Sequence, residues 1–296
     1  RFQIDTRCLQ SCSVLPRLFH KMVRGHFASA LFGNQDAFEQ ARRSLIGRVS
    51  ELGGNACTSC TLVKKTTICN DRSRSEPVQR FTFQAPASMN INTALRQVAL
   101  VEGRMYSATP RRPDGTFDLI VRVYKNGNIS RWLDSLEPGA SVNMKPFPPT
   151  LPTDRRNPGR YVGLVAYGIG ITELYWTALN ELQDPRVKEV VLLYATRTME
   201  DQKVFGPELA QLLREPRFRL ERVLSRECAA GARTGHVDAR MLAEVFPWED
   251  KRSQARFAAA GTKGMMETTY TWLRELGYPN SFKLIRDLTF ASLLGR

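Results

Sequence analysis

The sequence has few of the residues on which hydrolases and metalloproteases depend. It contains three scattered histidines in 296 residues, and it holds no G-x-S-x-G and no H-E-x-x-H motif. These absences weigh against both enzyme classes. No apolar run reaches the roughly 20 residues that a helix needs to cross a bilayer, so no transmembrane segment is expected.

Cysteine is also too scarce for one common class of small fold. Six cysteines in a chain of this length do not suggest a secreted disulfide scaffold. Four of them form two close pairs, Cys8/Cys12 and Cys57/Cys60, and such pairs can hold zinc or an iron–sulfur cluster when they fold together. Their spacing matches no common zinc finger. We therefore expect no metal site, with a metal held by these four thiols as the alternative.

Acidic residues are outnumbered, with 29 Asp and Glu against 43 Lys and Arg, and the net charge is +14. A basic excess raises the affinity for polyanions such as RNA, anionic lipid or an acidic protein, but it does not choose among them. The alternative is a basic organellar protein whose charges are simply solvated. The early segment is rich in Arg and Ser, poor in acids and without a long apolar stretch, which favours a mitochondrial location.

The first half of the chain changes pattern near residue 56. Residues 1–55 predict a basic helical appendage, with helices over 16–32 and 36–52. Residues 56–150 turn to a period of two, and many short strands at this spacing predict a small antiparallel β-barrel. The expected strands cover residues 61–68, 78–85, 94–102, 103–109, 116–125 and 141–147, and one helix covers 129–136.

The second half alternates strands and helices. Residues 151–159 are rich in proline and predict a linker to an α/β domain over 160–285, which residues 286–296 extend. A strand over 160–167, a glycine loop, a helix and a second strand form a right-handed parallel unit. Its loop lies at the carboxyl end of the first strand, where Gly168 and Gly170 can let a phosphate or a flavin ring approach the backbone. Later strands are expected over 217–227, 255–262 and 281–285, and helices over 207–215, 239–246 and 265–278.

Four motifs follow one another along these two domains. They read RMYS at 104–107, VRVYKNGNISRWLDSLEPGASV at 121–142, GIGIT at 168–172 and AGTKGM at 260–265. Together with the order of barrel and parallel sheet, they resemble the ferredoxin-NADP reductase superfamily, and within it NADH–cytochrome b5 reductase. The resemblance covers about residues 60–285. It implies a two-domain fold with an antiparallel FAD-binding barrel followed by an α/β nicotinamide-binding domain.

The resemblance also implies the site residues. FAD is expected at Arg104, Tyr106, Ser107, Tyr124, Gly127, Ile129, Ser130 and Thr172, with Ser107 and Thr172 in the catalytic positions, and NADH or NADPH at Gly168, Gly170, Gly261 and Met265. An arginine can fork onto the diphosphate of the flavin, and a helix start that carries a serine hydroxyl is a sound anion site.

The departures from the family pattern fall mostly on the nicotinamide side. Glu173 stands where the family has proline, Ala260 replaces its cysteine, and MKPFPPTLP replaces the G-P-x-G motif. A carboxylate beside an incoming diphosphate would repel it by about 1 kcal/mol if solvated. On the flavin side, Ala108 and Ala140 replace a proline and an aspartate.

Two functions therefore stand side by side. The first is an FAD-containing oxidoreductase that passes electrons from nicotinamide through flavin to an acceptor such as a haem protein. The alternative is a catalytically degenerate protein of the same fold, serving as a structural or assembly subunit of a large mitochondrial complex, a ribosome or other ribonucleoprotein or a respiratory assembly, with or without FAD. The sequence names neither the acceptor nor the choice between NADH and NADPH.

Overall fold

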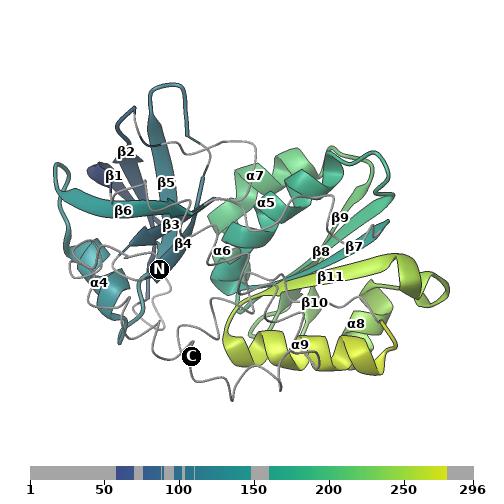
Figure 1. Cartoon of the computed structure of the whole chain (residues 1–296). Helices are drawn as coiled ribbons and strands as arrows, with labels where there is room; N and C mark the ends of the chain where they lie inside the picture. The colour runs from purple at the N-terminus through teal and green to yellow at the C-terminus, as the bar shows by residue number, and fades with distance from the viewer. Residues whose placement is uncertain are drawn as a thin grey trace, which may run out of the picture. The chain divides into compact units, whose positions relative to one another are not determined.

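The computed structural model describes residues 58–69, 76–87, 89, 97–101, 104–109, 111–147 and 160–278 (Figure 1). The two N-terminal helices, the linker over 151–159, the strand over 281–285 and the extension over 286–296 are predictions that lie outside these residues. The same holds for three of the four paired cysteines, Cys8, Cys12 and Cys57.

The first described domain is a closed antiparallel barrel. Its strands are β1 (Thr58–Cys69), β2 (Val78–Gln84), β3 (Gln97–Val101), β4 (Arg104–Ala108), β5 (Thr116–Arg122) and β6 (Ser141–Phe147), arranged in the order β1-β2-β5-β4-β3-β6. Helix α4 (Asn128–Ser135) lies between β5 and β6 in the chain. All six strands and this helix confirm the sequence prediction.

Alternation along the strands fills the barrel. Phe81 pairs with Leu119 and Phe83 with Phe117 across β2 and β5, so their inward side chains are direct neighbours. All four are fully buried, and the rings of Phe83 and Phe117 stack with centroids 5.9 Å apart. Burying a side chain of this size contributes about 1.5–3 kcal/mol each. Cys60 is also buried in this core.

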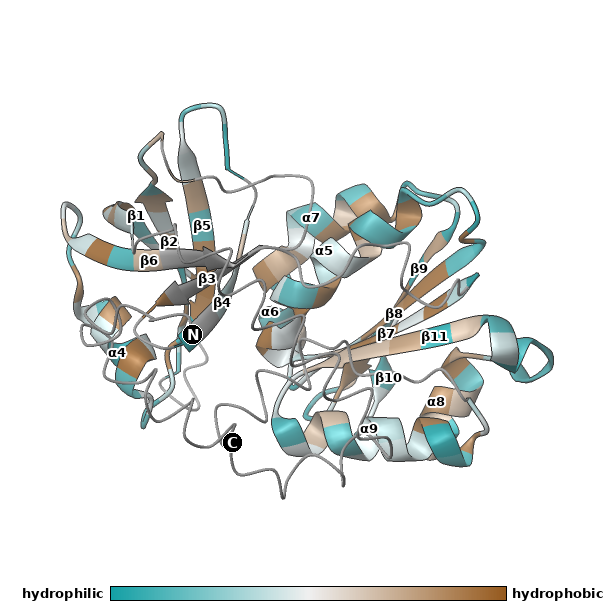
Figure 2. Cartoon of the chain, viewed as in Figure 1, coloured by the Kyte–Doolittle hydropathy of each residue, from teal (hydrophilic) through white to brown (hydrophobic). Residues whose placement is uncertain are grey.

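The second domain is a five-stranded parallel sheet in the order β10-β9-β8-β7-β11. Its elements are β7 (Tyr161–Tyr167), the 3-10 turn η5 (Gly168–Gly170), α5 (Ile171–Leu182), β8 (Glu189–Thr196), α6 (Met199–Gln202), the 3-10 turn η6 (Lys203–Phe205), α7 (Gly206–Leu212), β9 (Phe218–Leu224), β10 (Arg233–Thr234), α8 (Ala239–Val245), β11 (Ala255–Ala260) and α9 (Lys263–Glu275). The parallel sheet confirms the prediction, whereas β10 and α6 were not expected. Much of the sheet is hydrophobic and the loops are mostly hydrophilic (Figure 2).

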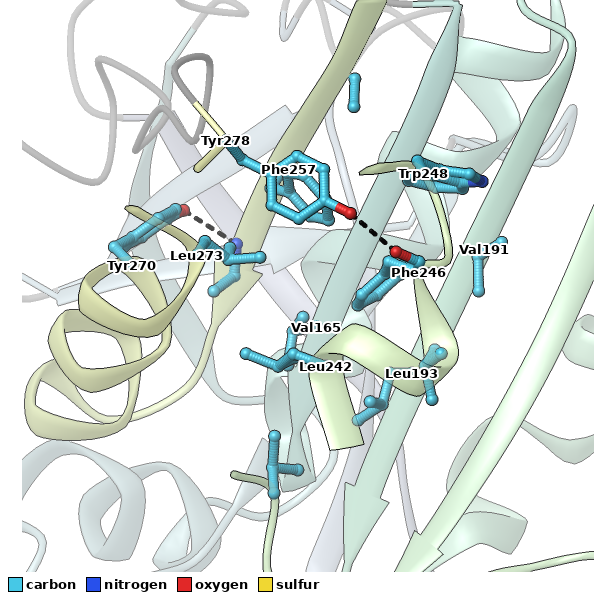
Figure 3. Packing of buried hydrophobic residues seen from close by; sticks show 14 of the residues in the cluster. Val165, Val191, Leu193, Leu242, Phe246, Trp248, Phe257, Tyr270, Leu273 and Tyr278 are labelled. Carbon is cyan, nitrogen blue, oxygen red and sulfur yellow. Dashed lines mark hydrogen bonds between the residues drawn. The ribbon is translucent and has the colours of Figure 1, made fainter. Parts of the chain in front are cut away.

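An aromatic cluster holds α8 and α9 on the sheet (Figure 3). The Phe257 ring lies 5.1 Å from the Phe246 ring and 4.7 Å from the Tyr278 ring, measured between centroids. The Tyr278 hydroxyl donates to the carbonyl of Phe246 at 2.7 Å, and the backbone N–H of Ala259 donates to the Tyr270 hydroxyl at 2.8 Å. These contacts hold the middle of α9 against β11 and the residue Tyr278, after the helix, against the end of α8.

Candidate functional site

The turn between β5 and α4 presents backbone N–H groups at a helix start. Gly127 precedes α4 and no side chain caps the helix there, so its first N–H groups have no partner within the helix. The Ser130 hydroxyl instead accepts a hydrogen bond from the backbone N–H of Tyr124 at 3.2 Å, and the Gly127 N–H donates to the Tyr124 carbonyl at 2.9 Å. The turn is therefore held from within while the helix start remains available to an anion.

Glycine is required at position 127 by a close approach. A Cβ there would lie 2.3 Å from the Ser130 Oγ and 3.2 Å from the Tyr124 Cβ. Ser130 is buried at 6% exposure, and Ile129 packs against the barrel core. Tyr124 itself is exposed, at 45% of its surface. The structure thus brings together four of the predicted flavin residues within one turn.

Strand β4 carries the other predicted flavin residues of the barrel. Because side chains alternate along a strand, Arg104 and Tyr106 share one face of β4 and Ser107 lies on the other. Tyr106 packs against the barrel core. Burial raises its pKa to about 12, although the positive charge of Arg104 acts in the opposite direction. The phenol therefore stays protonated at neutral pH and can donate a hydrogen bond.

The predicted nicotinamide loops pack against one another at the carboxyl edge of the sheet. A Cβ on Gly170 would lie 2.3 Å from the carbonyl oxygen of Ala260, and a Cβ on Gly261 would lie 2.7 Å from the Tyr167 Cβ. Gly168 differs, since it has a φ of +53° and a Cβ there would meet nothing within 4 Å. At two of the three positions, Gly170 and Gly261, neighbouring parts of the chain leave no room for a Cβ. Of the three, only Gly168 borders open space.

The remaining predicted residues lie on the two helix starts that follow these loops. The Thr172 hydroxyl donates to the carbonyl of Ile169 at 3.0 Å, which ties it into the turn before α5. Met265 lies in the first turn of α9 with 48% of its surface exposed. η5 packs against β5 and α5 against β4. Thr172 therefore lies in the first turn of a helix that packs against the strand carrying Tyr106.

A tyrosine that the sequence did not single out connects these helix starts. The Tyr167 hydroxyl lies 2.6 Å from the Thr269 hydroxyl, which in turn donates to the carbonyl of Met265 at 2.8 Å. Burial raises the pKa of Tyr167, so the group stays protonated. Its place at the end of β7, directly before the glycine turn, is the signal that could have identified it.

The one described residue of the cysteine pairs lies away from any ligand cluster. The Cys60 sulfur contacts the Met89 sulfur at 3.3 Å inside the barrel, and burial raises the thiol pKa to about 11. Within the described ranges, no group of three or more His, Cys, Asp or Glu side chains is placed to hold a metal ion. No helix among the same residues is long and apolar enough to cross a membrane.

Comparison with known families separates the chain into the same two domains. Residues 59–147 match the oxidoreductase FAD-binding domain, and residues 164–271 match the oxidoreductase NAD-binding domain. An uncharacterized oxidoreductase of Saccharomyces cerevisiae, AIM33, is 25% identical over 94% of this chain and 90% of its own length. NADH-cytochrome b5 reductase 2 of Neurospora crassa is 29% identical over 52% of this chain and 45% of its own length. The chain thus spans about half of that reductase.

Solved structures share the fold. The cytochrome b5 reductase domain of Ulva prolifera nitrate reductase superposes with a TM-score of 0.60 at 22% identity, over 77% of this chain and 97% of that one. A ferredoxin NADP+ reductase from Neisseria gonorrhoeae with bound FAD and NADP gives a TM-score of 0.59 at 19% identity, over 77% and 94%.

Proposed function

Since this chain belongs to the ferredoxin-NADP reductase superfamily, with FAD-binding and NAD-binding domains of the cytochrome b5 reductase type, we propose that it moves electrons from NADH or NADPH through FAD to a one-electron acceptor. The observation that supports this most is the start of α4, where no side chain caps the helix. The Ser130 hydroxyl is engaged by the Tyr124 N–H instead, so it stabilises the preceding turn without covering the first N–H groups of the helix. A turn built in this way leaves its N–H groups for a diphosphate.

The residues of the barrel fit FAD. The N–H groups at the start of α4 would bind the diphosphate, and Arg104 would supply a positive charge that can pair with it. The protonated phenol of Tyr106 would contact the flavin ring, and Ser107 remains a predicted contact to its reactive edge. When bound, FAD supplies the chemistry that couples a two-electron donor to a one-electron acceptor. The protein binds and orients it.

The residues at the sheet edge would orient the nicotinamide rather than react with it. Ala260 is buried at the end of β11 and provides no thiol. The open side of Gly168, together with Thr172 and Met265, forms the expected surface for the nucleotide. Tyr167 and Thr269 hold the two helix starts that frame this surface. The contribution of these groups is alignment, which can account for a large part of a rate enhancement.

The acceptor is proposed to be a haem protein with an acidic surface. The net charge of +14 would raise the rate of encounter with such a partner and make that rate sensitive to salt. A mitochondrial location is proposed from the Arg-rich and Ser-rich start of the chain.

An absorption spectrum before and after anaerobic addition of NADH or NADPH tests the proposal. A yellow protein that bleaches, at about 1 per second or faster, supports the reductase. A colourless protein that cannot be reconstituted with FAD refutes it. A flavin that stays oxidised, in a protein that co-sediments with a large ribonucleoprotein or respiratory particle, favours the structural subunit instead.

A further inference from the structure

A buried ion pair connects the barrel to the nucleotide domain, within one compact unit of the chain. The Arg122 guanidinium, at the end of β5, donates to the Asp201 carboxylate of α6 at 2.8 Å. The two side chains are only 8% and 4% exposed. Burial alone would lower the pKa of Arg122, but its hydrogen bond to Asp201 and the charge of that carboxylate raise it. The guanidinium of Arg122 therefore stays charged, and both side chains of the pair are removed from water.

The carboxylate side of this pair is held rigidly. Asp201 lies in the first turn of α6, and its backbone N–H donates to the Thr198 hydroxyl at 3.3 Å. The Tyr194 hydroxyl donates to the Asp201 carbonyl at 3.3 Å, and the Gln202 amide donates to the Tyr194 carbonyl at 3.1 Å. The helix is thereby tied to β8 by its backbone as well as by side chains.

A second pair, which is partly exposed, links the same face of the barrel to the nucleotide domain. Arg80 of β2 donates to Glu208 of α7 at 3.2 Å, and the same guanidinium lies 3.4 Å from Asp118 of β5. Arg80 pairs with Ile120 across the two strands, so it shares an outward face with Asp118 and Arg122. One face of the barrel therefore meets α6 and α7 through two arginines and two carboxylates.

The position of these pairs matters for the proposed function. Arg122 lies two residues before Tyr124, where the flavin turn begins. Asp201 lies five residues after Thr196, which ends β8 at the carboxyl edge of the sheet. The buried pair thus joins the segment expected to hold FAD to the edge expected to hold nicotinamide. A buried pair adds little net stability, because desolvation offsets the attraction, but its geometry is specific.

We propose that Arg122 and Asp201 are positioning residues that set the nicotinamide edge of the sheet relative to the flavin turn of the barrel, with Arg80 and Glu208 as a weaker second link. This inference rests on the proposed function. Without this link, each cofactor would still bind, but the two would no longer be aligned with each other. The rate of electron transfer between them would then fall. A misplacement of about 1 Å can cost about 100-fold in rate.

The test compares the full-length holoprotein with a double variant, Arg122→Met with Asp201→Leu, which leaves no unpaired charge. Glu200→Gln is the matched control, because it removes an exposed pair with Lys203 from the same helix. Rapid mixing with NADH or NADPH gives the limiting rate of flavin reduction and the half-saturating concentration. Hydrogen exchange over residues 199–208 reports the link without turnover. Bound FAD is counted from absorbance.

We expect the double variant to keep its FAD and its half-saturating concentration, to lose at least about tenfold in limiting rate, and to exchange faster over residues 199–208. The control is expected to match the wild type in FAD content, half-saturating concentration, limiting rate and hydrogen exchange. A limiting rate within twofold of the wild type overturns the inference, as does a rate that falls only in proportion to lost FAD.

If the double variant fails to fold, Glu208→Gln leaves the barrel intact and is expected to lower the rate severalfold with full FAD content. An unchanged rate in that variant also overturns the inference. A wild type without flavin, or one that nicotinamide does not reduce, refutes the proposed function instead, and the exchange data then decide whether the link exists.

Discussion

Replacing Gly170 by alanine tests the packing between the two loops that are predicted to hold nicotinamide. Gly170 has an ordinary helical backbone, with φ −58° and ψ −16°, so alanine meets no conformational penalty there. Its Cβ would lie 2.3 Å from the Ala260 carbonyl oxygen and 2.6 Å from the carbonyl carbon. The obstacle is backbone that is held in a sheet, and no side-chain rotation relieves it.

The size of the effect follows from that contact. To restore an ordinary separation, the turn before α5 must move away from the end of β11 by about 1 Å. Overpacking of this kind costs about 1–3 kcal/mol in stability, and a shift of about 1 Å at a site that aligns two reactants can cost about 100-fold in rate. Flavin content should change little, because the residues expected to hold the FAD diphosphate lie in the barrel.

Gly264→Ala is the matched control. A Cβ on Gly264, in the first turn of α9, would meet nothing within 4 Å, and alanine is favoured over glycine in a helix by about 0.5–1 kcal/mol. Urea unfolding gives the two stabilities, and rapid mixing with NADH gives the two limiting rates of flavin reduction. We expect the control to match or exceed the wild type in stability and in limiting rate, and Gly170→Ala to fall below the wild type in both quantities. Equal stability and equal rates for the two variants would refute the argument.

Three further predictions address the barrel. Ser130→Ala removes the hydroxyl that accepts the hydrogen bond of the Tyr124 N–H and holds the turn before α4. It should weaken FAD binding by about tenfold, measured by flavin fluorescence during titration of the apoprotein. Ser135→Ala, an exposed change on the same helix, should bind FAD like the wild type. Burial raises the pKa of Asp118, but hydrogen bonds from its arginine and threonine partners and the arginine charges outweigh this and hold it below its ordinary value of 3.8. Its stabilising effect is therefore complete above that value and is lost as the pH falls through the lowered pKa. Asp118→Asn should cost about 3 kcal/mol at pH 7 and flatten the acid limb of the stability curve, whereas a parallel downward shift at every pH would contradict this assignment. The Cys60 thiol, with a pKa of about 11, should resist iodoacetamide at pH 8 in the folded protein, whereas the exposed Cys228 should react. Mass spectrometry of the peptides checks this, and equal labelling of the two would show that the barrel core is open.

Much of the fold was predictable because its signals are local. The strand patterns in the barrel and the apolar strands β7 and β8 depend on neighbours a few residues apart, and both types were confirmed. β10 has two residues and α6 has four, which is too short for any periodicity to show. Their positions depend on Leu224 and Thr198, through the parallel pairing with β9 and the cap on α6.

The candidate site divides in the same way. The sequence by itself determined the two domains, their order and the motif residues at the turn before α4, since each motif is a short run with its own chemistry. Only the tertiary structure decided that Gly170 and Gly261 must lack a Cβ because other parts of the chain pack closely against them, while Gly168 borders open space. It also paired Arg122 with Asp201 across 79 positions. Such contacts depend on how distant elements pack, and no local pattern of residues encodes that packing.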